Sequence, residues 1–219
     1  MSSHYLDSYL FAQRSQKQIK TIGWMIGIGW VGASVAASVT GNGLPAEQQP
    51  ALVYYALGHH HYSQGFLPVQ LLTYSFIHTL NLHLVLNLIT LHATVNISRL
   101  CLTPAAFIRL YSLGSILGGL VFLLMSASAA QPQALIGAGT ALMAMIGAVA
   151  VLQPQVKILF FVIPMRLLWV PLIQLAILLY SVKSNPALSM GLIAGLIAGV
   201  IYGLAERMWK RLSKDTYRT

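Results

Sequence analysis

The apolar residues of this chain fall into six long runs separated by short polar segments. Each run is close to, or longer than, the roughly 20 residues that an α-helix needs to cross a bilayer. Residues 1–20 are polar and the first run is itself long enough to span, so we expect no cleaved leader. The pattern predicts an all-α integral membrane protein built as a six-transmembrane-helix bundle. The predicted spans are residues 21–39, 69–95, 105–126, 134–153, 158–181 and 187–205.

The second span differs from the others because its first half carries many polar side chains. Such side chains are costly to expose to lipid, so we expect them to face the bundle interior or a water-filled cavity. These positions are Thr73, Tyr74, Ser75, His78, Asn81, His83 and Asn87.

Composition agrees with a bilayer environment. Of 219 residues, 57% are hydrophobic and 8% are charged, whereas a soluble domain carries about 25% charged residues. A net charge of +9 could indicate nucleic acid, but Lys and Arg gather in the cytoplasmic loops of membrane proteins. We therefore expect membrane lipids and no nucleic acid as partners. The single cysteine, Cys101, excludes an internal disulfide.

The basic residues also predict the orientation. Twelve of the 13 Lys and Arg residues fall on one side of the predicted membrane, and only Lys183 falls on the other. By the positive-inside rule both termini are cytoplasmic, as in a bacterial inner membrane. We expect a cytoplasmic N-terminal segment at 1–20, a membrane domain at 21–205 and a basic cytoplasmic tail at 206–219.

Small residues recur at helical spacing in the later spans. In the sixth span glycines fall every four residues, and small residues at this spacing let two helix backbones approach closely. The fourth span offers a similar small-residue surface, and the third has Gly114 and Gly118. The stripe is expected to face the bundle interior. Its members are Gly191, Gly195, Gly199 and Gly203.

His83 and Asn87 are four residues apart and therefore share one face of a helix. Donors placed in this way could stabilise a developing oxyanion. They could equally hydrogen-bond neighbouring helices, and the pair alone does not decide between these roles.

Four motifs in order resemble the rhomboid family of intramembrane serine proteases. The second span reads Thr73-x-x-Phe76-x-His78-x4-His83-Leu84-x-x-Asn87, similar to the family's second helix. The other three are Gly137-Ala138-Gly139-Thr140-Ala141-Leu142 with the helix after it, Lys157–Pro164 and Gly191–Gly195. The resemblance covers about residues 50–205 and implies the six-helix rhomboid-like bundle, with His83 and Asn87 as oxyanion-type donors.

The chain departs from the family at both catalytic positions. The family's nucleophilic serine matches Gly139, and its general-base histidine in the sixth helix matches Leu188. No histidine lies beyond residue 92, so no shift of alignment restores the base. Val69-Gln70 replaces the family's usual Trp-Arg pair. Thr140 is the fallback nucleophile, but a hydroxyl is weak without an adjacent base.

The resemblance therefore implies a catalytically degenerate member, a pseudoprotease that binds transmembrane segments of client proteins. One alternative is an active intramembrane serine-type endopeptidase with an unrecognised nucleophile. A second alternative is a small transporter or channel, which would explain the polar second span.

We expect no cofactor and no metal site. His59-His60-His61 lie in the first external loop, but consecutive residues rarely converge on one metal, and no Cys or carboxylate cluster accompanies them.

Overall fold

The computed structural model describes a helical membrane domain with one β-hairpin. The described residues are 3–41, 55–58, 67–78, 82–127, 133–160 and 163–216. The predicted positions His59-His60-His61 and Asn81 lie outside them.

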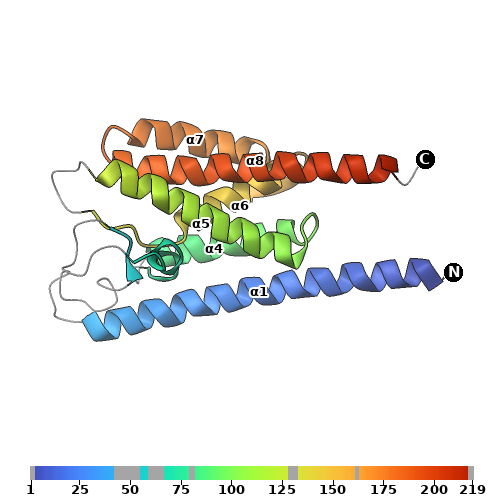
Figure 1. Ribbon diagram of the computed structural model, residues 1–219, viewed down its shortest axis with the longest axis horizontal. Coiled ribbons are helices and arrows are strands. Elements are labelled where there is room, and N and C mark those ends of the chain that lie inside the picture. The colour runs from blue at the N-terminus through green and yellow to red at the C-terminus, as the bar shows by residue number, and fades with distance from the viewer. Residues whose placement is uncertain are drawn as a thin grey trace.

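Three of the described helices are long and apolar enough to cross a membrane. They are α1 (Ser3–Gly41), α5 (Pro104–Ser126) and α8 (Pro186–Thr216). Three shorter apolar helices accompany them: α4 (Leu82–Ser98), α6 (Gly139–Leu152) and α7 (Trp169–Ser181). Figure 1 shows that α1 begins and α8 ends at the same end of the molecule.

The third predicted span is confirmed to within one residue, because α5 occupies 104–126. Its start has local causes. The Thr103 side chain accepts a hydrogen bond from the Ala106 N–H at 3.2 Å, which satisfies one of the unpaired amides of the first turn. Pro104 follows at the first helical position, where its missing N–H has no cost.

The prediction of one continuous second span at 69–95 is wrong. The structure has α3 (Gln70–Thr73) and a short 3₁₀ helix, η2 (Tyr74–Phe76), and α4 begins only at Leu82. Ile77 ends η2 in an extended conformation with φ −92° and ψ 125°. Polar side chains around this break form hydrogen bonds with the backbone of other segments, as described below. Ile77 and His78, the described residues of the irregular chain, are buried and therefore not exposed to lipid.

The fifth predicted span, 158–181, begins too early. Its first part forms an antiparallel hairpin of β1 (Lys157–Phe160) and β2 (Ile163–Arg166), in which Leu159 pairs with Pro164. Proline in a helix interior removes a hydrogen bond and clashes with the preceding turn, whereas a strand edge tolerates it. The helix α7 therefore starts only after the hairpin.

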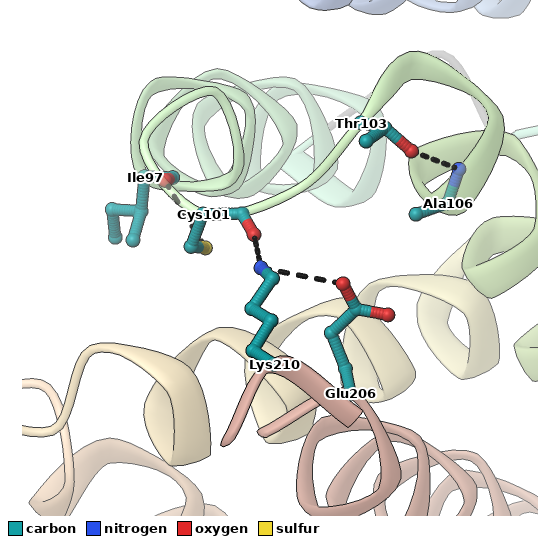
Figure 2. Close-up of polar contacts among 6 residues, drawn as sticks. All are labelled: Ile97, Cys101, Thr103, Ala106, Glu206 and Lys210. Atoms are coloured by element: carbon teal, nitrogen blue, oxygen red, sulfur yellow. Dashed lines mark hydrogen bonds and ion pairs between the residues drawn. The ribbon is translucent and has the colours of Figure 1, made fainter. Parts of the chain in front are cut away.

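The sixth helix is longer than predicted, because α8 continues through residues 206–216. Figure 2 shows how this extension is held. The Lys210 ammonium donates to the Cys101 carbonyl at 2.6 Å and forms an ion pair with Glu206 at 3.2 Å. The hydrogen bond to Cys101 attaches α8 to the turn between α4 and α5, and the ion pair lies within α8. Burial raises the pKa of the neighbouring Cys101 thiol to about 11.

The glycines of α8 lie directly against the backbone of α6. A Cβ atom added at Gly195 would collide with the backbone of Thr140, and one added at Gly199 would collide with the backbone of Ala144. At Gly203 the same atom would come within 2.9 Å of the Ala148 carbonyl oxygen. Each step of four residues on α8 matches a step of four on α6, so the two helices run parallel in a fixed register.

The helix α5 completes a three-helix core through its own glycines. A Cβ at Gly114 would come within 2.5 Å of the Ala144 Cβ. Gly118 is equally close to Thr140, and its added Cβ would also come within 2.8 Å of the Gly191 carbonyl oxygen. Small residues thus permit backbone contact among α5, α6 and α8 at once.

Replacing Gly199 with alanine should destabilise the fold by roughly 1–3 kcal/mol. The added methyl group meets backbone atoms of Ala144, which cannot rotate away as a side chain can. Thermal unfolding in detergent measures the loss. The control is Gly32→Ala on α1, where nothing lies within 4 Å of the added atom. Equal midpoints for the two variants would contradict the close packing of α6 on α8.

Candidate functional site

The candidate site lies where two irregular segments meet inside the bundle. One is the break between η2 and α4, and the other is the chain leading into α6. The Gly137 N–H donates to the Tyr74 carbonyl at 2.9 Å, and Leu57 and Leu135 exchange two backbone hydrogen bonds at 3.0 and 2.7 Å. Buried non-helical backbone is tolerated in a membrane protein when such partners satisfy it.

His78 joins these segments to α1. Its Nε2 accepts from the Ala138 N–H at 3.2 Å, and its own backbone N–H donates to the Ser34 hydroxyl at 3.0 Å. The ring lies between Trp30 and His83, with centroid separations of 4.9 and 5.3 Å. His78 is only 3% exposed, so its contacts give it a positioning role at the entrance to α6.

A buried chain of hydrogen bonds supports this arrangement from the α5 side. The Trp30 indole N–H donates to the Tyr111 hydroxyl at 3.2 Å, which donates to the Ser75 hydroxyl at 3.1 Å. Ser75 in turn donates to the Leu72 carbonyl at 2.7 Å. Tyr74, Ser75, His78 and Asn87, four of the polar side chains predicted to face the interior, are buried, as their cost in lipid requires.

His83 and Asn87 lie on the first turns of α4, one helical turn apart. The His83 ring lies against Gly137, where an added Cβ would come within 2.5 Å of its Cε1 atom. Asn87 is 9% exposed, and its side-chain NH₂ group has no hydrogen-bond partner among the described residues. A buried donor without a partner is uncommon in native structures.

Gly137 has a backbone conformation that favours glycine, with φ +91°. It therefore permits both the turn before α6 and the approach of His83.

Gly139 is the first residue of α6 and faces α8. A Cβ added there would come within 2.9 Å of the Leu192 Cδ2 atom. Leu188, one turn earlier on α8, packs in a cluster with Leu57, Tyr74 and Leu135. The surroundings that the structure describes at these two positions are aliphatic and aromatic.

Thr140 is 1% exposed, and its hydroxyl is hydrogen-bonded to the Tyr74 hydroxyl. Tyr74 also donates to the Ser115 carbonyl at 2.8 Å. The printed partner of the Thr140 hydroxyl therefore lies on η2, and Tyr74 links it to α5. No histidine is among the hydrogen-bond partners that the structure gives Thr140.

Sequence reasoning missed several residues of this region. Gln70 is 3% exposed, and its side-chain oxygen accepts from the Leu67 N–H at 3.2 Å. Leu192 is not indicated by the sequence either, and Tyr74 is predicted only to face the interior. No pattern of periodicity indicates them, because their contacts depend on how distant segments meet. Within the described ranges no group of three or more His, Cys, Asp or Glu side chains is placed to hold a metal.

These observations define an integral membrane protein of packed apolar helices with a polar cluster at a broken span. The chain matches the Rhomboid domain over residues 67–208, about two-thirds of its length. It therefore belongs to the rhomboid family. A comparison with curated proteins found no match to the chain.

Replacing Gly137 with alanine should destabilise the protein by roughly 1–2 kcal/mol from its left-handed backbone alone. It should also displace the His83 ring, because the methyl group occupies the same space. Thermal unfolding gives the stability, and the chemical shifts of a labelled His83 report the displacement. Gly27→Ala, which would make ordinary contacts, is the control and should leave the His83 signals in place.

Proposed function

We propose that this rhomboid-family protein is a pseudoprotease that binds transmembrane segments of client proteins. It crosses a bacterial inner membrane six times with both termini in the cytoplasm. Residues 1–20 and 206–219 are its cytoplasmic ends, and residues 21–205 form the membrane domain.

The observation that best supports this proposal is the apolar contact between Leu192 and Gly139, the position that matches the family's nucleophile. Gly139 has no side chain, and Leu192 lies where an added one would extend. Leu188 occupies the position of the general base and is packed among apolar residues. Hydrolysis needs a nucleophile, a base and oxyanion donors together, and of these only His83 and Asn87 match the family pattern.

Thr140 is a poor substitute nucleophile. Its hydroxyl is engaged by Tyr74 within a buried network, and a base is required to take its proton. An active protease would therefore need a nucleophile and a base other than the residues named here.

A groove between α4, α6 and α7 supports the client-binding part of the proposal. Its volume is about 340 Å³, and aliphatic residues form most of its lining. The exceptions include Gln174, whose side-chain oxygen is buried without a hydrogen-bond partner among the described residues. An apolar groove with an unsatisfied acceptor suits a spanning segment that carries one polar donor.

The positions of the basic residues support the orientation. Arg14, Lys17 and Lys20 lie on the N-terminal half of α1, and Arg207 and Arg211 on the C-terminal part of α8. Figure 1 places these two ends together. Lys183 lies in the turn between α7 and α8, at the opposite end, so the positive-inside rule assigns the termini to the cytoplasm.

The purified protein should neither cleave transmembrane substrates nor react with a serine-directed fluorophosphonate. Losing nucleophile or base lowers hydrolysis by roughly 10⁶-fold in a well-studied serine protease. In-gel fluorescence with an active rhomboid protease as positive control measures the labelling. Robust labelling of the unmodified chain would overturn the pseudoprotease proposal, and Thr140→Ala would then test the first candidate nucleophile.

A restored site provides the matched comparison. Gly139→Ser combined with Leu188→His supplies both missing groups, and Leu192→Ala makes room for the new side chain. Labelling is expected in this combined variant and in neither Gly139→Ser nor Leu188→His alone.

Client binding is testable by photocrosslinking in intact membranes. A benzoylphenylalanine at Leu86, which lines the groove and is 44% exposed, should capture spanning segments of other membrane proteins. The same probe at Ile108 on α5, 49% exposed and outside the groove, is the control. Adduct peptides are identified by mass spectrometry. Equal capture at both positions would contradict a client site between α4 and α7.

A further inference from the structure

A second groove lies on the opposite side of α4, between that helix and α1. Its volume is about 680 Å³. Its walls are glycine, aliphatic and aromatic residues, and the exceptions are Lys20 and His92. The residues that line it include Gly23, Trp24, Ile28, Gly32, Leu88 and Val95.

The groove narrows toward one end and opens toward the other. A Cβ added at Gly23 would collide with Val95, whereas one at Gly27 would make an ordinary contact with Leu88 at 3.4 Å. Since the partner number falls as the α1 number rises, the two helices run antiparallel, and they lie closer together at Gly23 than at Gly27.

The narrow end is cationic. Lys20 lies one turn before Gly23, with Lys17 a further turn along α1, and Arg99 lies in the turn that follows α4. Helical spacing places Lys17 on the face that carries Lys20. The one acidic side chain that the structure describes, Glu206, is on α8 and paired with Lys210. No described carboxylate therefore offsets the charge of this end.

Aromatic contacts form part of the groove's wall at this level. The Trp24 ring lies edge-on to His92 with centroids 6.4 Å apart, and His92 shares a hydrogen bond with the Asn96 amide at 2.9 Å. Trp24 and Ile28 expose 65% and 67% of their surface. Tryptophan is enriched where hydrocarbon meets headgroups, so the groove passes from an interface-like end into the apolar span.

We propose that this groove binds one anionic glycerophospholipid, independently of any client. An acyl chain lies along the groove from Gly23 toward Gly32, and the phosphate lies at Lys20 and His92. The apolar lining suits a hydrocarbon chain, and Lys20 and His92 are the polar groups that line it. The uncompensated cations favour a net negative headgroup over a zwitterionic one.

The test uses the full chain, delipidated in an uncharged detergent. Dioleoylphosphatidylglycerol and dioleoylphosphatidylcholine, which share their acyl chains, are titrated while the thermal midpoint and the bound mass are measured. The phosphatidylglycerol should bind with one copy per chain and raise the midpoint at lower concentration. Lys20→Gln should weaken its apparent affinity roughly fivefold, the factor expected for one basic residue near an anionic headgroup.

Two further variants make the outcome specific. Arg109→Gln removes the same charge from an exposed position on α5 outside the groove and should leave the affinity unchanged. Gly32→Leu places a bulky side chain in the groove lining and should weaken the binding of both lipids. An equal response to the two lipids, an equal loss in Lys20→Gln and Arg109→Gln, or a lipid-free dimer that masks Trp24 would each overturn the proposal.

Discussion

Backbone contact between α6 and α8 is the constraint on which the rest of this structure depends. In a membrane, helices gain little from hiding apolar surface from lipid, so association relies on close packing and on hydrogen bonds. The glycines of α8 bring its chain against the carbonyl groups of Thr140 and Ala144. Gly147 on α6 does the same in return, since an added Cβ would lie 2.6 Å from the Leu196 carbonyl oxygen. Because both surfaces are smooth, the two helices cannot separate without losing contact along several turns at once.

That contact decides the character of the candidate site. The start of α6 is held at the bundle centre, so the chain leading to it must cross the interior without helical hydrogen bonds. Side chains of the broken second span satisfy it, with His78 holding Ala138 and the Tyr74 carbonyl holding Gly137. The same polar groups that would suggest catalysis in isolation thus have a structural task. Among the described residues, the His78 Nδ1 atom and the Asn87 side-chain NH₂ group have no hydrogen-bond partner.

The sequence predicted much of the fold because its strongest signals are local. The third span was located by its apolar length, and α5 occupies it to within one residue. The break at Ile77 was not predictable from periodicity, since its cause is a partner segment some 60 residues away. The hairpin at 157–166 had a local signal in Pro164, but the apolar character of its neighbours indicated a span instead. For the site, alignment of motifs indicated Gly139 and Leu188, whereas the contact of Leu192 with the Gly139 position required coordinates.

Glycine contacts repeated every four residues do not by themselves specify one alignment of α8 along α6. Sliding α8 along α6 by one repeat moves it about 6 Å and brings Gly199 to the place of Gly195, so the repeat alone leaves neighbouring alignments almost degenerate. Only features that occur once can break this translational symmetry. Lys210, which reaches the Cys101 carbonyl and is drawn in Figure 2, is such a feature. A surface lysine far from the candidate site therefore contributes to selecting the alignment in which Leu192, rather than a residue one turn away, faces Gly139.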